Sequence, residues 1–295
     1  MGIHLKRAAK ELALDAAGST LVSSSGTLTR ATLRNLRIGF EPQGEGKTRP
    51  WKEPAAACVS VDFDVTKPGR EAPNRTGTFA LAELSEKYSI PLTWAVCGRT
   101  AEEDPESYSR ILDSKAEREI GVHTYSHLDA SQAGEDELEA EIKRCVAVLG
   151  LPAPPRTFVF PWNREAHFDL LSRLGFTAYR GKARVIGGLS RARGLWNIPP
   201  VYYVDQKSVG AASLMKRYVD LCVKHRAVFH LWTHPWSIVE EGGSAERVVE
   251  TALEPVFAYM ALKRDEGLLH TSTMGGIASA LDGVARAAPA ISAPN

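Results

Sequence analysis

Residues 57–64 read ACVSVDFD, an apolar run that becomes acidic at its carboxyl end. A short continuous apolar run is typical of a strand buried on both faces, as in parallel sheets covered by helices. In such folds the loops that leave the carboxyl ends of the strands converge on one crevice, where reactive groups gather. The segment therefore predicts a parallel α/β fold with Asp62 and Asp64 at its reactive edge.

The same pattern continues along the chain as short apolar runs, each followed by a segment of helical spacing. Strands are predicted at 92–97, 119–123, 157–160, 176–180, 227–232 and 268–272, and helices at 78–89, 135–149, 165–174, 211–224, 246–263 and 275–284. Roughly seven β/α units favour an α/β fold of the distorted (β/α)-barrel type with about seven strands. An open doubly wound sheet is the alternative, although no GxGxxG follows the first strand.

Composition divides the chain into three parts. Residues 1–54 are polar and rich in Ser, Thr, Gly and Pro, apart from a short amphipathic stretch at 3–16, and are predicted to be an N-terminal extension. Residues 55–284 are predicted to form the barrel. The tail at 285–295 is rich in Ala and Pro, and we expect it to be disordered.

The bulk numbers exclude several classes of protein. With 295 residues, 24% charged residues and a formal net charge of +1, the chain gives no electrostatic reason to expect a nucleic acid partner. No stretch approaches ~20 consecutive apolar residues, so no membrane span is predicted. The four cysteines form no CxxC pair, which indicates buried thiols in a reducing compartment. Because no secretory hydrophobic region is recognised near residue 1, we expect a cytoplasmic location.

Two histidines four residues apart, His123 and His127, follow one of the predicted strands. This spacing places both imidazoles on one face of a helical turn, within reach of a single ion. Two His and one Asp leave coordination positions open for water and a substrate oxygen, as a hydrolytic site requires. Taken alone, such a pair is more often two surface or hydrogen-bonded histidines.

Asp62 and Asp64 project to the same side if residues 57–64 form a strand. Burying two carboxylates together is unfavourable unless a cation or a proton compensates, and metal binding by one of them resolves the conflict. A solvated loop is the alternative environment. Glycosyltransferases also use Asp-x-Asp to hold a metal-bound nucleotide sugar, so the element does not distinguish group transfer from hydrolysis.

Five segments occur in an order that resembles the polysaccharide deacetylase family, carbohydrate esterase family 4. They are DFD at 62–64, LTWAVCG at 92–98, EIGVHTYSH at 119–127, FVFPWN at 158–163 and LWTHP at 231–235. The resemblance covers about residues 57–272, and it implies a distorted barrel with a metal-dependent N-deacetylase activity.

By position, the resemblance implies that Asp62 is the general base, that Asp64, His123 and His127 are the metal ligands, and that His234 is the general acid. Metal-bound water would lose a proton to Asp62 and attack the amide carbonyl, and His234 would protonate the departing amine. One divalent ion is implied; the ligand set suits Zn²⁺, and Ni, Co, Mn or Fe would also fit.

Two features depart from the family pattern. The family's arginine before the Pro-aromatic pair, which pairs with the catalytic base, falls on Val159, so Arg164 and Arg180 become the candidates for that charge. The aspartates are separated by one residue rather than adjacent, as in divergent members. His230 competes with His234 for the acid role, but it lies inside the predicted strand, and we interpret it as a hydrogen-bonded core histidine.

Further residues near the same strand ends are predicted to contact the substrate. Flat aromatic faces suit the apolar side of a sugar ring, and amide or guanidinium groups suit its hydroxyl and acyl oxygens. Asn163 is also a good cap for the helix that follows. The predicted substrate contacts are Pro161, Trp162, Asn163, Arg164, Arg180 and Trp236.

Together these features predict a hydrolase of non-peptide C–N bonds that removes an N-acyl group, N-acetyl by the resemblance, from an amino sugar or glycan intermediate. A nucleotide- or lipid-linked sugar is the expected form of the substrate. A hydrolase of a non-sugar amide, a glycosyltransferase and a non-catalytic glycan-binding protein are the alternatives. The pattern defines no oligomeric state.

Overall fold

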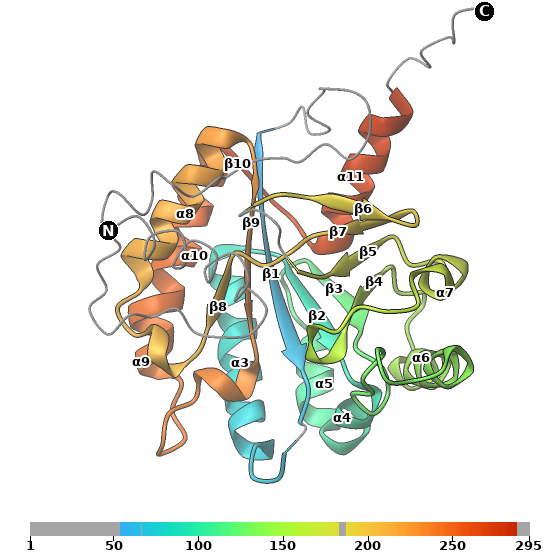
Figure 1. The fold of residues 1–295 in the computed structure, drawn as a ribbon. Helices are drawn as coiled ribbons and strands as arrows, with labels where there is room; N and C mark the ends of the chain where they lie inside the picture. Colours follow the sequence, from blue (N-terminus) through green and yellow to red (C-terminus); the bar gives the residue numbers. More distant parts are fainter. Residues whose placement is uncertain (1–53, 66, 183–186, 288–295) are drawn as a thin grey trace, which may run out of the picture.

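A curled sheet surrounded by helices forms the body of the protein (Figure 1). The computed structural model describes residues 54–65, 67–182 and 187–287. The strands are β1 (Ala55–Phe63), β2 (Leu92–Val96), β3 (Arg118–Val122), β4 (Thr157–Val159), β5 (Ala178–Arg180), β6 (Ser190–Ala192), β7 (Leu195–Asn197), β8 (Tyr202–Val204), β9 (Val228–Thr233) and β10 (Leu269–Thr271). Their order is β6-β7-β5-β4-β3-β2-β1-β9-β8, and β10 pairs with β1. All of these pairs are parallel except β6 with β7.

The helices cover the outside of the sheet and one end of its interior. They are α3 (Glu71–Tyr88), α4 (Gly98–Glu103), α5 (Pro105–Leu112), α6 (Glu135–Leu149), α7 (Phe168–Arg173), α8 (Ala212–His225), α9 (Glu246–Val248), α10 (Glu254–Asp265) and α11 (Met274–Ala287). Four shorter turns are η1 (Pro161–Asn163), η2 (Gln206–Ser208), η3 (Pro235–Ile238) and a π-helical turn, η4 (Val249–Leu253).

The predicted α/β class and distorted barrel are confirmed, as are the predicted strands and helices to within a few residues at most ends. The helix predicted at 78–89 begins earlier, at Glu71. The elements that the sequence pattern missed are α4, α5 and β6 to β8, each only three to eight residues long.

The central strand β1 shows how the sheet separates two environments. Its outward residues, Ala55, Ala57, Val59, Val61 and Phe63, join the main apolar core beneath the helices. Its inward residues Ala56 and Cys58 join a second cluster, to which α11 contributes Met274, Ile277, Ala278 and Leu281. Because side chains alternate along a strand, the next inward positions are Ser60 and Asp62, toward the carboxyl end. An apolar plug thus fills one end of the interior, and polar groups occupy the other.

A half-buried carboxylate links the apolar plug to the strands. Glu119 on β3 accepts hydrogen bonds from the Thr93 hydroxyl at 3.0 Å and from the backbone N–H of Gly275, in the first turn of α11, at 2.8 Å. The Thr157 hydroxyl donates to its other oxygen. The glutamate of the EIG segment therefore connects three strands to the start of α11.

Several predictions concern regions at or beyond the edges of the described residues. The extension at 1–54 and the tail at 285–295 lie outside them, apart from Pro54 and the end of α11.

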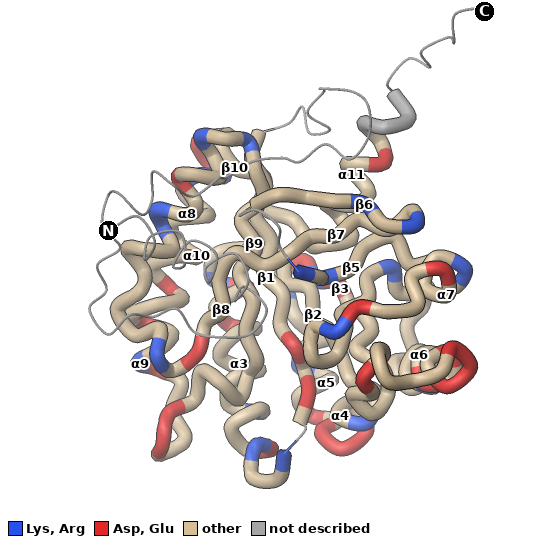
Figure 2. The backbone as a smooth tube through the Cα atoms, in the orientation of Figure 1, with Lys and Arg blue, Asp and Glu red and all other residues tan. Residues whose placement is uncertain are grey.

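All four cysteines are buried and free, as predicted. Among the described helices, none has both the length and the hydropathy to cross a membrane. Charges of both signs alternate over the outer helices, with an acidic first turn in α6 (Figure 2).

Candidate metal centre and active site

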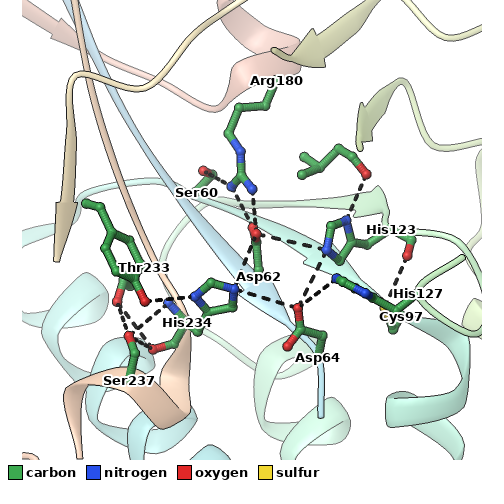
Figure 3. A network of polar contacts seen from close by, with 12 residues as sticks. Ser60, Asp62, Asp64, Cys97, His123, His127, Arg180, Thr233, His234 and Ser237 are labelled. Carbon is green, nitrogen blue, oxygen red and sulfur yellow. Dashed lines mark hydrogen bonds and ion pairs between the residues drawn. The ribbon is translucent and has the colours of Figure 1, made fainter. Parts of the chain in front are cut away.

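Two carboxylates and three imidazoles meet at the carboxyl ends of the central strands (Figure 3). Nε2 of His127 lies 3.4 Å from Oδ2 of Asp64, and Nε2 of His123 lies 3.6 Å from the same oxygen. Nε2 of His234 approaches from β9, 3.7 Å from Asp64 Oδ2 and 3.8 Å from Asp62 Oδ2. The structure therefore brings all five predicted acid, base and ligand residues into one site.

The separations around Asp64 fit a shared cation. Ligand atoms that each lie about 2.0–2.1 Å from a tetrahedral ion are about 3.3–3.4 Å apart, whereas a hydrogen bond is shorter than about 3.2 Å. Nδ1 of His123 donates to the carbonyl oxygen of Val159 at 2.8 Å, which leaves the Nε2 lone pair facing Asp64. A backbone carbonyl in this position is a common support for a metal-binding histidine. The donor set Asp64, His123 and His127 thus suits a divalent metal.

A second group of possible ligands overlaps the first. Asp62, Asp64 and His234 also place one atom each within 4.8 Å of one another. However, both oxygens of Asp62 are hydrogen-bonded to Arg180, at 2.6 and 2.5 Å. An ion pair of this geometry satisfies the carboxylate and leaves it a poor additional ligand. The set with two histidines is therefore the better metal site.

The two histidines are held by a loop and not by the helical turn expected from their spacing. β3 ends at Val122, and the loop contains two residues in the left-handed region, Thr124 (φ 58°) and His127 (φ 63°). Glu141 of α6 accepts from the backbone N–H and the hydroxyl of Ser126, at 2.7 and 3.0 Å. The expectation of a helical turn was wrong because these long-range bonds fold the segment back on itself.

Arg180 supplies the positive charge beside Asp62. It projects from β5 and is paired in register with Val159 of β4, the position where the family pattern has its arginine. Only 1% of its surface is exposed, and its guanidinium carbon lies 4.3 Å from the ring centre of Trp232. Arg164, the other candidate, forms an ion pair with Asp129 at the surface. Sequence alone left these two arginines undecided.

The environment keeps Asp62 ionised. Burial alone would raise the pKa of this carboxyl, but the charge of Arg180 and the neighbouring His123 outweigh it and leave the pKa below its usual value of 3.8. Asp64 is shifted in the same direction and further, because His234, His123 and His127 surround it and outweigh its burial. Both groups are therefore carboxylates at neutral pH.

His234 is held from two sides. Nδ1 lies 3.2 Å from the hydroxyl of Tyr203 on β8, and the ring of Trp236 is stacked at 4.5 Å and 33°. Trp236 also donates its indole N–H to Oδ1 of Asp64 at 3.2 Å, which places it against the candidate metal ligands rather than in open solvent. Burial lowers the pKa of His234, and the attraction of Asp64 and Asp62 compensates only in part.

Close packing against α3 positions η3, the turn that follows His234. A Cβ atom on Gly77 would lie 2.0 Å from the carbonyl oxygen of Pro235, so only glycine allows the backbone of η3 to approach so closely. This contact fixes the turn that begins directly after His234. Sequence analysis did not single out Gly77, because the approach joins segments more than 150 residues apart.

The remaining predicted substrate contacts differ in position. Trp162 is 55% exposed, has φ 58°, and places its ring 4.8 Å from that of His127. Asn163 lies beside it but does not cap the next helix, whose N-cap residue is His167. Pro161 is buried, and Arg180 is buried behind Asp62.

Two polar residues were missed: Tyr203 was not considered, and Ser60 was treated as part of an apolar strand. The interpretation of His230 as a hydrogen-bonded core histidine is confirmed, since it is fully buried and contacts Ser60 and Ile198. A signal was available, because Ser60 and Asp62 are two residues apart on β1, and His230 and Trp232 are two apart on β9. Alternation places each pair on one face.

Comparisons with known proteins agree with the predicted family resemblance. Residues 52–177 match the family model described as polysaccharide deacetylase. A structure from Mycobacterium smegmatis, assigned as a polysaccharide deacetylase, aligns with a TM-score of 0.60 and 17% identity over 83% of this chain and 96% of the other. One from Pseudomonas aeruginosa, assigned likewise, aligns with a TM-score of 0.62 and 14% identity over 80% and 94%. At these identities the likeness confirms the fold. A search of curated proteins found no match.

Proposed function

From the site geometry, the fold and the match of residues 52–177 to the polysaccharide deacetylase family model, we propose that the chain is a metal-dependent hydrolase that removes an N-acyl group, N-acetyl in the simplest case, from an amino sugar or glycan intermediate. One observation carries the proposal. Asp64 faces two imidazoles at 3.4 and 3.6 Å, while His234 lies 3.8 Å from the ionised Asp62 on the opposite side. A candidate ligand set and an acid–base pair thus lie side by side.

Asp64, His123 and His127 would hold one divalent cation, and the mixed nitrogen and oxygen donors favour Zn²⁺. When bound, such an ion lowers the pKa of a water molecule and polarises the acyl carbonyl oxygen. The other residues of the site then have defined tasks around these two oxygen atoms.

Asp62 acts as the general base. Its carboxylate accepts a proton from the attacking water, whose oxygen bonds to the acyl carbon while the carbonyl π electrons move onto the carbonyl oxygen. Arg180 keeps Asp62 ionised and holds its orientation through two parallel hydrogen bonds. The reaction at this stage has formed the C–O bond and still contains the C–N bond.

His234 acts as the general acid. As the C–N bond breaks, the imidazolium donates its proton to the nitrogen, so the products are a carboxylic acid and a free amine. Because burial lowers the pKa of His234, its protonated ring is a stronger acid than an ordinary imidazolium. The 3.8 Å between Nε2 of His234 and Oδ2 of Asp62 is longer than a hydrogen bond, so the two groups act on different atoms of the substrate.

An exposed aromatic residue beside the candidate ligands supports a sugar substrate. Trp162 is exposed beside His127 and offers a flat face to the C–H side of a pyranose. An N-acetyl amino sugar, either within a glycan or carried on a nucleotide or lipid, is the proposed substrate class. A non-catalytic glycan-binding role was suggested by the absence of an arginine at Val159, and Arg180 removes that reason.

The test measures acetate release from N-acetylglucosamine oligomers and from nucleotide-linked N-acetyl sugars by the zinc-loaded protein. Asp62→Asn should lose nearly all turnover and keep its zinc, whereas His127→Ala should lose zinc and turnover together. Acetate release that survives Asp62→Asn would contradict the assigned base. Glycan binding without release before and after the change would indicate a binding protein, and nucleotide-sugar consumption without acetate would indicate a transferase.

A further inference from the structure

A chain of fully buried polar groups lies behind the proposed base. Ser60 is on β1 and His230 on the neighbouring β9, and neither side chain has measurable exposure. Nε2 of His230 lies 2.8 Å from Oγ of Ser60, and Oγ of Ser60 lies 3.1 Å from Nη1 of Arg180. Figure 3 shows Ser60 and Asp62 contacting the same guanidinium. The chain thus leads from His230 through Ser60 to the arginine that holds the base.

The contact between His230 and Ile198 decides where the hydrogens lie along this series of hydrogen bonds. Nδ1 of His230 lies 2.8 Å from the carbonyl oxygen of Ile198, and a carbonyl can only accept, so Nδ1 carries a hydrogen. Burial and the charge of Arg180 lower the pKa of His230 to about 3, so the ring is neutral at pH 7. A neutral ring with a hydrogen on Nδ1 has its lone pair on Nε2. Ser60 must therefore donate its hydroxyl hydrogen to His230.

This direction leaves the oxygen of Ser60 free to accept from Arg180. Each of these three contacts then joins a donor to an acceptor: Nη1 of Arg180 to Ser60, Ser60 to His230, and His230 to Ile198. With the opposite ring tautomer, Nε2–H would face the serine hydroxyl, and Nδ1 would present a lone pair to a carbonyl oxygen. The arrangement is consistent in one direction only.

Arg180 needs such support because of the way it reaches the site. It extends from β5 across the interior to β1, and its Nε has no hydrogen-bond partner in the described part of the chain. Nη1 is shared between Ser60 and Asp62, and Nη2 contacts Asp62. A third anchor beside the carboxylate fixes the plane of the guanidinium, and that plane sets the orientation of Asp62.

We propose that Ser60 and His230 are positioning residues, which hold Arg180 so that the carboxylate of Asp62 faces the attacking water. They touch neither the substrate nor the proposed metal ligands and act through the guanidinium alone. The inference rests on the proposed function for its kinetic consequences, but not for its proton arrangement.

The first experiment needs no activity. The zinc-loaded protein is labelled with nitrogen-15 at histidine, and NMR measures the couplings between the ring nitrogens and the hydrogens on the ring carbons. These couplings report the tautomer of His230, whose signals are assigned by their absence in His230→Gln. The expected result is a neutral ring with hydrogen on Nδ1, the minor form of free histidine. A ring with hydrogen on Nε2, or a ring that is charged at pH 7, would overturn the proposal.

The second experiment separates positioning from packing by using two amides. Glutamine at 230 places its amide where Nε2 was and can still accept from Ser60, whereas asparagine reaches only as far as Nδ1 and keeps only the bond to Ile198. For acetate release we expect His230→Asn and Ser60→Ala to lower kcat about 10-fold, the lower end for groups that orient catalytic residues. KM and zinc content should stay within twofold, and His230→Gln should restore most of kcat.

Ser85→Ala is the matched control. Its hydroxyl is equally buried and donates to the carbonyl of Ile90, far from the site, so a general effect of losing a buried serine would appear there as well. Equal losses for the Gln and Asn variants, or a kcat of Ser60→Ala equal to that of the wild type, would refute positioning. If the wild-type protein released no acyl group at all, the proposed function would fail; the tautomer, and a displaced guanidinium in a crystal structure of Ser60→Ala, would still decide this inference.

Discussion

Replacing Arg180 with leucine tests the ion pair on which the proposed base depends. In the native protein the guanidinium donates two hydrogen bonds to Asp62, at 2.6 and 2.5 Å, and both side chains are buried. Removing one partner of a buried pair costs about 3–5 kcal/mol, because the other charge is left uncompensated. At about 2–4 °C per kcal/mol for a domain of this size, Tm should fall by roughly 6–20 °C.

The same change should weaken catalysis in a recognisable way. Arg180 lowers the pKa of Asp62, so its loss raises that pKa and moves the acidic limb of the kcat profile to higher pH. At pH 7 we expect kcat to fall about 100-fold, within the range for loss of a general base that is only partly disabled. Zinc content should not change, since the three proposed ligands are untouched.

Arg164→Leu is the control for the loss of one positive charge. Its side chain is 57% exposed and pairs with Asp129, and surface pairs contribute only about 0–1 kcal/mol. We expect the Tm of this variant to fall by no more than about 4 °C and its kcat to match that of the wild type. The comparison also decides experimentally which of the two arginines serves the base.

An arginine on the neighbouring strand should replace the ion pair that Arg180→Leu removes. Val159 is the register partner of Arg180 on the adjacent strand, about 4.8 Å away, and its structural contact with His123 is made by the backbone carbonyl. Compared with Arg180→Leu, the double variant Val159→Arg/Arg180→Leu should regain at least half of the decrease in Tm and have a kcat about 10-fold higher, because a buried ion pair with Asp62 is reformed. The reasoning is refuted if the double variant is no better than Arg180→Leu, or if Arg180→Leu melts like the wild type.

Three further changes test separate parts of the site. Trp162→Ala should raise KM for N-acetylglucosamine oligomers about 2- to 12-fold, the value of one aromatic contact, with Tm and kcat unchanged because the ring is 55% exposed; an unchanged KM would exclude it as a sugar platform. Gly77→Ala should displace Pro235 and with it His234, and a displacement near 1 Å lowers kcat about 100-fold. Full activity in steady-state assays would show that the close contact between Gly77 and Pro235 does not position His234. The pKa of His230 is lowered from 6.5 to about 3, so the unfolded chain binds the extra proton and stability is lost as pH falls from 6.5 toward 3. Between pH 7 and pH 5, the free energy of unfolding measured with urea should therefore fall by about 2 kcal/mol less in His230→Gln than in the wild type. An equal fall in both proteins would contradict the buried neutral ring.

Local pattern was enough for the fold and for most of the site. The apolar runs gave the main strands because burial on both faces requires consecutive apolar side chains. The residues that follow these strands, Asp64, His123 and His234, were predicted together because the carboxyl ends of parallel strands share one edge. That relation needs only the direction of each strand, which the sequence contains.

Loop conformation was beyond the same reasoning. The spacing of His123 and His127 suggested a helical turn. Instead, the hydrogen bonds that Ser126 donates to Glu141 and the left-handed residues Thr124 and His127 produce an irregular loop. The imidazoles meet at Asp64 in either case, so the predicted group was right and the predicted geometry was wrong. Spacing constrains how far two residues are apart, but not the path between them.

By itself, then, the sequence determined which reactive groups the strand ends present, since periodicity and direction are local properties of the chain. Only the tertiary structure decided which arginine pairs with Asp62 and that Ser60 and His230 stand behind it. These contacts join residues 118 and 170 positions apart, and they depend on the lateral order and register of the strands. Register is set by the packing of the whole barrel, which no single segment encodes.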